Sequence, residues 1–140
     1  MKKLIVLMVT VFLSTLFVSN LDAQTNSNST KNQKVVKVYY FHSTNRCATC
    51  NAVENVTKMV INEQFKEQIS KGLIEFKSIN IDEEVNEKLV KKYKIVFSTL
   101  LIINKNGVAN DYTDTAFQYA KNNPDKYKEL LKVEINKALK

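Results

Sequence analysis

Both cysteines of this chain lie in one tetrapeptide, Cys47-Ala48-Thr49-Cys50, at the point where a β-type pattern gives way to a helical one. The preceding run, Val35–Phe41, is short, β-branched and aromatic, which predicts a buried strand. From Cys47 to the breaker Gly72, apolar residues recur every three or four positions, which predicts one long amphipathic helix. A buried strand that leads directly into a helix favours a fold of the α/β class.

The pattern after Gly72 predicts a second strand over Leu73–Ile81, followed by a short helix with Asp82 as its N-cap. The apolar face of that short helix is formed by Val85, Leu89, Val90 and Tyr93. Thr99–Ile103 predicts a third strand, which the Asn-Gly signal in Asn104-Lys105-Asn106-Gly107 joins to an antiparallel fourth strand, residues 108–112.

The C-terminal part of the chain predicts two further helical segments. Asp114 is expected to cap a helical turn, and Asn123-Pro124 is expected to start the last helix, with proline at its first position. The last helix should bury Tyr127, Leu130, Leu131 and Ile135. The order β-α-β-α-β-β-α predicts an α/β fold with a mixed four-stranded sheet that helices flank on both faces.

The N-terminal residues have the pattern of a secretory signal peptide. Lys2 and Lys3 precede the apolar run Leu4–Val18, and a polar stretch ends at the small residue Ala23. The run is shorter than the roughly 20 apolar residues that span a bilayer. We therefore expect a signal peptide over residues 1–23, a flexible leader without apolar residues over 24–34, and one domain over 35–140. The mature protein is expected in an oxidising compartment, the periplasm or cell envelope, without a membrane-spanning segment.

Composition and charge exclude several classes of protein. With 44% hydrophobic residues, 25% charged residues, two glycines and one proline, the chain is neither collagen-like nor wholly disordered. The formal charge is +7, and removal of Lys2, Lys3 and Asp22 lowers it by one. The charge is spread along helix faces, which predicts solubility and weak attraction to anionic envelope surfaces rather than nucleic-acid binding. We expect a monomer.

The position of the two cysteines predicts redox chemistry. Their spacing places both sulfurs on the same side of the first helical turn, where free backbone N–H groups and the helix dipole favour a thiolate. Arg46 adds a fixed positive charge next to Cys47. A purely structural disulfide is the alternative, but closing so short a loop contributes about 2 kcal/mol at most. The predicted redox centre is the Cys47–Cys50 pair itself, without another cofactor.

Metal binding is a competing hypothesis. His42 lies five residues before Cys47 and could join Cys47 and Cys50 in a zinc or copper carrier. Such a site needs a fourth ligand, and the chain contains no other histidine or cysteine. We therefore interpret His42 as a loop residue beside the end of the strand, which could also tune the thiols or pass a proton. A third hypothesis is an inert interaction domain.

The succession of segments resembles the thioredoxin superfamily over residues 35–112. The motifs that carry the resemblance are Tyr39-Tyr40-Phe41, the CxxC, Asn80-Ile81-Asp82-Glu83, Lys92-Tyr93-x-Ile95, Ser98-Thr99-Leu100-Leu101 and Lys105-Asn106-Gly107. The resemblance implies a thioredoxin-like fold. It also implies that Cys47 is an exposed attacking nucleophile and that Cys50 is the buried resolving thiol.

Two departures from the superfamily bear on the site. The family places a cis-proline in the loop that faces the CxxC, and here Ser98, or Thr99 in an alternative alignment, takes that place. A hydroxyl there can hydrogen-bond a thiolate, and the missing ring leaves space for a metal ion. The buried acid that the family uses as proton acceptor is replaced at or near Tyr40.

A second resemblance covers nearly the whole mature chain. The motifs are Tyr39-Tyr40-Phe41-His42, Arg46-Cys47-Ala48-Thr49-Cys50, Asp111-Tyr112, Ala116-Phe117, Tyr119-Ala120 and Asn123-Pro124-Asp125-Lys126-Tyr127. Together they resemble a small bacterial thioredoxin-like family named for a nitrophenyl compound nitroreductase subunit. This implies a redox-active accessory subunit that passes electrons to or from a specific thiol or disulfide partner, such as a membrane electron carrier. The resulting hypothesis is a secreted thiol–disulfide oxidoreductase.

Overall fold

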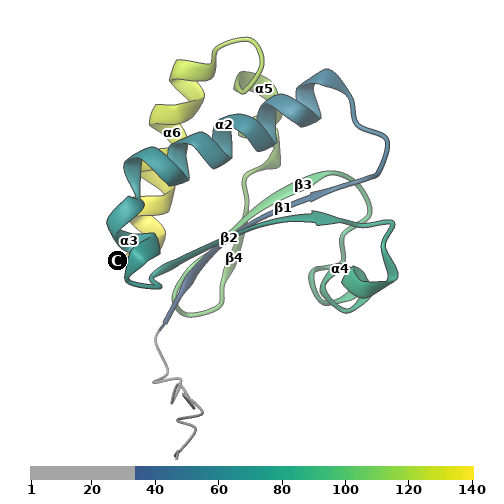
Figure 1. Cartoon of the computed structure of the whole chain (residues 1–140), viewed down its shortest axis with the longest axis horizontal. Coiled ribbons are helices and arrows are strands. Elements are labelled where there is room, and N and C mark those ends of the chain that lie inside the picture. The colour runs from purple at the N-terminus through teal and green to yellow at the C-terminus, as the bar shows by residue number, and fades with distance from the viewer. Residues whose placement is uncertain (1–33) are drawn as a thin grey trace, which may run out of the picture. The chain divides into compact units, whose positions relative to one another are not determined.

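The computed structural model describes residues 34–140 (Figure 1). The predicted signal peptide and residues 24–33 of the predicted leader lie outside the described residues. The elements in chain order are β1 (Val36–His42), α2 (Ala48–Gln64), α3 (Lys66–Ser70), β2 (Ile74–Asn80), the 3₁₀ turn η1 (Glu84–Asn86), α4 (Glu87–Tyr93), β3 (Thr99–Ile103), β4 (Ala109–Asp111), α5 (Thr113–Tyr119) and α6 (Pro124–Ala138). Within this range no helix is both long and apolar enough to span a bilayer.

The four strands form one mixed sheet in the order β2-β1-β3-β4. β1 runs parallel to β2, with Val36 opposite Ile74, and antiparallel to β3, with Phe41 opposite Thr99. β3 and β4 form the antiparallel hairpin that the Asn-Gly signal predicts, with Gly107 at a positive φ of 82° in the turn. The predicted mixed four-stranded sheet is confirmed. The register brings the C-terminal end of β1 and the N-terminal end of β3 to the same end of the sheet.

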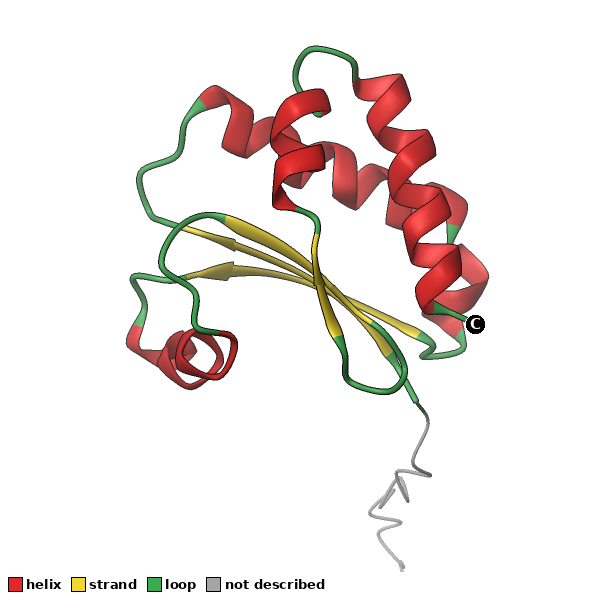
Figure 2. Ribbon diagram, turned by 180° about the vertical axis from the view of Figure 1, so that it is seen from behind, coloured by secondary structure: helices red, strands yellow, loops and turns green. Residues whose placement is uncertain are grey.

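Helices cover both faces of the sheet, as predicted. Figure 2 shows α2, α5 and α6 on one face and α4 on the other. Successive side chains of β1 enter two different cores: Val38 and Tyr40 pack under α2 and α6, whereas Tyr39 and Phe41 pack on the α4 side. Burial on both faces explains why the sequence of β1 is nearly continuously apolar, with Lys37 as its one charged residue, rather than alternating.

The predicted long helix is wrong in one respect, because it breaks at Phe65 rather than continuing to Gly72. Phe65 leaves helical geometry, with φ −125° and ψ 25°, and lies fully buried in the core. Its N–H still donates to Ile61 O at 3.1 Å, so the turn closes before α3 starts. Gly72 has a positive φ of 67° and ends the segment after α3.

Two of the predicted N-caps are also wrong. The Asp82 carboxylate accepts the N–H of Thr44 at 2.7 Å, from the loop after β1, instead of capping a helix. Asp114 lies inside the first turn of α5, and the carboxylate of Asp111 accepts the Thr113 N–H at 2.9 Å in its place.

The apolar face predicted for the short helix is confirmed only in part. Leu89, Val90 and Tyr93 pack against the core on the α4 side. Val85 is 83% exposed, because the chain enters α4 through η1 and this turn presents Val85 to solvent.

The last helix begins as predicted. Asn123 is its N-cap and accepts the Lys126 N–H at 3.2 Å, with Pro124 in the first turn. The predicted core positions Tyr127, Leu131 and Ile135 are fully buried. Leu130 is only half-buried, at the margin of the same helix face.

Candidate functional site

The CxxC lies at the N-terminus of α2, directly after the connection from β1. Cys47 is the N-cap residue, and its sulfur accepts the backbone N–H of Cys50 at 3.2 Å. The first turn of a helix leaves its N–H groups without intrahelical partners, so the Cys47 sulfur satisfies one of them. The helix start therefore places the sulfur of Cys47 where backbone donors favour a negative charge.

The two thiols differ in accessibility although their sulfurs are only 2.6 Å apart. Both cysteines are free; Cys47 is exposed and Cys50 is buried, with 9% of its surface accessible. Hydrogen bonds from Cys50 lower the pKa of Cys47 below the ordinary thiol value. The larger contribution comes from the Cys50 side chain and the smaller one from its backbone N–H. The accessible thiol is thus the one whose pKa is lowered.

Arg46 does not serve mainly as a positive charge for Cys47, in contrast to the sequence-based expectation. Its guanidinium forms an ion pair with Glu54 of α2 and donates to His42 Nδ1 at 2.9 Å and to Ser78 Oγ at 3.3 Å. These contacts tie the residue before the CxxC to α2, β1 and β2. The main cause of the lowered Cys47 pKa is hydrogen bonding at Cys50.

Glu54 is a site residue that the sequence reasoning missed. Burial raises its pKa, but hydrogen bonds from Arg46 and Ser78 outweigh this effect and hold the pKa below the ordinary value. Glu54 follows Cys50 by four residues and therefore lies on the same side of α2. That spacing is the signal that could have identified Glu54 as a partner of Arg46.

His42 is the last residue of β1 and not a loop residue as predicted. It pairs with Asn80 of β2 and has only 9% of its surface exposed. Its Nδ1 atom lies 2.9 Å from Arg46 Nε and 3.0 Å from the Ser43 carbonyl. The guanidinium can only donate and the Ser43 carbonyl can only accept, so Nδ1 hydrogen-bonds one of them at a time: it accepts from Arg46 when the ring proton is on Nε2, and donates to Ser43 when the proton is on Nδ1. Within residues 34–140, no group of three or more His, Cys, Asp and Glu side chains is arranged to hold a metal ion.

Tyr40 lies directly behind the cysteine pair. Its hydroxyl donates to the carbonyl oxygen of Cys50 at 3.1 Å, and the side chain is fully buried. Burial raises the Tyr40 pKa well above the ordinary phenol value, and contact with Cys50 raises it further. The phenol therefore stays protonated and acts as a hydrogen-bond donor, not as a base. Tyr40 lies at or near the position where the superfamily has its buried acid.

Ser98 and Thr99 lie at the same end of the sheet as the CxxC. Thr99 starts β3 and pairs with Phe41, next to His42 at the end of β1. The Thr99 hydroxyl donates to the Phe97 carbonyl at 2.9 Å, which uses its proton locally. A hydrogen bond from Ser98 to a thiolate stays a prediction.

No model of a known protein family and no curated protein matches the sequence of this chain. The fold and the site define an α/β domain with an exposed and a buried free thiol at the N-terminus of a helix. Function is therefore argued from the chemistry of this pair and of the residues that hold it.

Proposed function

We propose that this protein is a thiol–disulfide oxidoreductase in which Cys47 is the nucleophile and Cys50 the resolving thiol. The observation that carries the proposal is the pairing of an exposed, acid-shifted Cys47 with a buried Cys50 whose sulfur lies 2.6 Å away. Only a thiolate attacks a disulfide efficiently, so a lowered pKa on the accessible sulfur is what such a reaction requires.

The reaction proceeds in two steps. The Cys47 thiolate attacks one sulfur of a partner disulfide, a mixed disulfide forms, and the partner's other sulfur leaves as a thiolate that takes up a proton. Cys50 then loses its proton and attacks Cys47, which releases the second partner thiolate. The partner is reduced by two electrons and the Cys47–Cys50 pair is oxidised by two. The same steps in reverse oxidise a partner dithiol.

The surrounding residues have positioning roles in this proposal. Tyr40 donates its one hydroxyl proton to the carbonyl of Cys50 and so fixes the backbone of the buried cysteine against β1. Arg46, held by Glu54 and His42, anchors the chain at the entry to the CxxC. The hydroxyl of Ser98 is the remaining candidate for a hydrogen bond to a thiolate.

We also propose a thioredoxin-like topology and a role as an accessory subunit in the cell envelope. The topology is supported by the parallel β1–β2 pair, the antiparallel β3–β4 hairpin and the CxxC after the central strand β1. The accessory role and the location rest on the resemblance and on the N-terminal pattern of the sequence. The expected partner is a protein thiol or disulfide, and the expected state is a monomer.

A metal carrier built from His42, Cys47 and Cys50 has less support. The Nδ1 atom of His42 lies 2.9 Å from Arg46 Nε, so a metal ion at that nitrogen would have to displace the guanidinium. The nearby carboxylate, Glu54, is engaged in its ion pair with Arg46. Redox exchange requires no such rearrangement.

Two serine variants test the proposal. The reduced protein is mixed with a model peptide disulfide, and products are resolved by non-reducing electrophoresis and intact mass. The Cys50→Ser variant should accumulate a mixed disulfide with the peptide at Cys47, because the resolving thiol is missing. The matched Cys47→Ser variant should form almost none, because Cys50 is buried. Equal capture by the two variants, or capture by neither, would contradict the assignment.

A further inference from the structure

One end of the described domain is basic, which corrects the expectation that the positive charge is spread evenly. Two adjoining cavities of about 170 and 310 Å³ open there. Their linings contain six lysines, namely Lys34, Lys37, Lys92, Lys105, Lys137 and Lys140. Neither lining contains an aspartate or glutamate. We call these six residues the lysine end.

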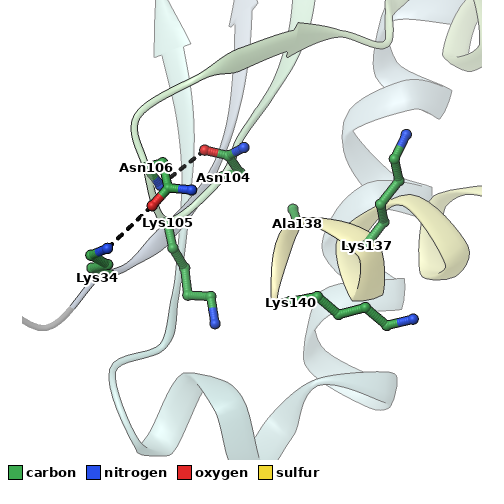
Figure 3. A pocket seen from close by; sticks show the side chains of 7 residues that line it. All are labelled: Lys34, Asn104, Lys105, Asn106, Lys137, Ala138 and Lys140. Atoms are coloured by element: carbon green, nitrogen blue, oxygen red, sulfur yellow. Dashed lines mark hydrogen bonds between the residues drawn. The ribbon is translucent and has the colours of Figure 1, made fainter.

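Segments far apart in the sequence form the lysine end. Lys34 precedes β1, Lys105 lies in the turn between β3 and β4, and Lys137 and Lys140 lie at the C-terminal end of α6 (Figure 3). The chain has no basic run at any of these places, so the cluster could not be seen in the sequence. It exists only because the sheet and α6 end at the same side.

The turn that carries Lys105 is held in a defined conformation. The side chain of Asn104 accepts the N–H groups of Asn106 and Val108, at 2.9 and 3.1 Å. Lys34 donates to the side-chain oxygen of Asn106 at 3.2 Å, which joins the turn to the start of β1. The backbone around Lys34 and Lys105 is thus fixed. The Lys34 side chain is held by Asn106, and Lys137 forms an exposed ion pair with Glu134 at 3.7 Å.

The ammonium groups around the first cavity do not converge on one point. Figure 3 shows the side chains of Lys105, Lys137 and Lys140 extending in different directions, with Lys34 turned towards Asn106. A site for a single small anion needs donors aimed at one position. Divergent lysines instead match negative charges spread over a surface.

The lysine end and the thiol pair lie at opposite ends of the sheet. β1 runs from Val36 at the lysine end to His42 near the CxxC, and Figure 1 shows the start of α2 and the end of α6 on opposite sides. Seven strand residues span about 20 Å at the usual rise. This exceeds the Debye length of about 8 Å at physiological ionic strength, so the lysines do not act on Cys47 electrostatically.

We propose that the lysine end binds the surface of a bilayer that contains anionic phospholipids, and that it holds Cys47 on the side facing away from the lipid. Lysines near such a surface are attracted to its negative potential. The first cavity offers lysine and asparagine side chains with Ala138 as its only apolar lining residue, and the apolar residues that line the second, Val35, Tyr93 and Ile103, are half-buried or buried. Protein interfaces bury an apolar centre, so this lining favours lipid headgroups over an acidic protein.

The test uses the chain from Gln24 onwards, which contains every described residue; those residues form one compact unit. Sedimentation with vesicles of phosphatidylcholine alone, or mixed with phosphatidylglycerol, measures the partition coefficient at low and at physiological salt. The parent should bind the anionic vesicles and lose binding as salt rises. It should not bind the neutral vesicles.

Two triple variants of equal net charge identify the surface. Lys34→Gln, Lys105→Gln and Lys140→Gln together should lower the partition coefficient by about a hundredfold, since each lysine near an anionic surface contributes about fivefold. The matched control changes Lys58, Lys121 and Lys126 to glutamine, all exposed and outside both cavity linings. It should stay within about threefold of the parent, because none of these charges belongs to the lysine end.

Three results would overturn the proposal. The first is a parent that does not bind anionic vesicles at low salt, even if it binds an acidic peptide, which would indicate a protein partner. The second is an equal loss in both triple variants, which would indicate net charge alone. The third is protection of Cys47 from a water-soluble alkylating reagent on vesicles, which would contradict the orientation. Failure of thiol exchange in the serine variants would leave these measurements unaffected.

Discussion

The phenol of Tyr40 donates a hydrogen bond to the backbone carbonyl of Cys50 across 3.1 Å, in an interior from which water is excluded. The bond joins β1 to the first turn of α2 and therefore fixes the buried cysteine relative to the sheet. Because burial keeps the Tyr40 pKa high, the phenol is a permanent donor at this position. Its single proton is donated to the Cys50 carbonyl, so Tyr40 positions the buried cysteine and does not exchange protons with it.

Removal of the Tyr40 hydroxyl should affect both stability and thiol chemistry. Tyr40→Phe should lower the free energy of unfolding by about 1 kcal/mol, the usual value for a lost hydrogen bond, and should slow closure of the Cys47–Cys50 disulfide. Tyr127→Phe is the matched control, because its hydroxyl is also buried and bonds to Thr57 at 2.7 Å. Urea denaturation and stopped-flow oxidation should show similar losses of stability in both variants and slower closure only in Tyr40→Phe. Equal closure rates would exclude Tyr40 from the site.

The reactivity of Cys47 should follow an acid-shifted titration. Hydrogen bonding from Cys50 lowers the Cys47 pKa, so the rate of alkylation against pH should have its midpoint below that of a free cysteine. Cys50→Ala removes the side-chain donor and retains the backbone N–H, and should move the midpoint upwards part of the way. Arg46→Gln is the comparison, and should move it less, because the guanidinium faces Glu54. A larger shift in Arg46→Gln than in Cys50→Ala would reverse this account of the lowered pKa.

The ion pair between Arg46 and Glu54 should make stability depend on pH in a defined direction. The Glu54 pKa is lower in the folded than in the unfolded protein, so its contribution is present above the unfolded pKa and is lost as pH falls through the folded one. Glu54→Gln should therefore be less stable than the parent at neutral pH, by about 1 kcal/mol. The difference should begin to shrink near the ordinary glutamate pKa of about 4.3 and should disappear only when pH falls below the lowered folded pKa. A difference of equal size at pH 7 and in acid would show that the charge of Glu54 is not involved.

Ser98→Pro tests whether the loop before β3 faces the thiols. A proline ring fills space, fixes φ and removes an N–H, so the variant should bind zinc or copper more weakly through its reduced thiols and exchange disulfides at an altered rate. Thermal unfolding establishes first that the variant is folded. A folded variant whose exchange rate and metal affinity equal those of the parent would place Ser98 outside the site.

Local patterns predicted much of the fold because its strands and turns depend on neighbouring residues. The apolar run of β1, the Asn-Gly turn before β4 and the Asn123 cap of α6 each act within a few positions. The break at Phe65 could not be predicted in this way. It depends on a side chain that packs into the core, a contact between distant parts of the chain.

The candidate site was predictable to the extent that it is local. Cys47 and Cys50 lie within one helical turn, so the helix start itself brings their sulfurs together. Which of the two is exposed was expected from the resemblance to the superfamily. Two other partners of Arg46 could not be predicted, because Ser78 belongs to β2, which is distant in the sequence, and His42 proved to belong to β1. Contacts assembled by the sheet, including the lysine end, require the fold.

Redox titration of the Cys47–Cys50 pair tests the central claim most directly. The parent protein is equilibrated in glutathione buffers of graded potential, its thiols are trapped in acid and alkylated, and the products are counted by intact mass. We predict one reversible two-electron transition in which both cysteines become oxidised together as an intramolecular disulfide. Two thiols that stay reduced across the range, or a stable glutathione adduct at Cys47 alone, would contradict the proposed function.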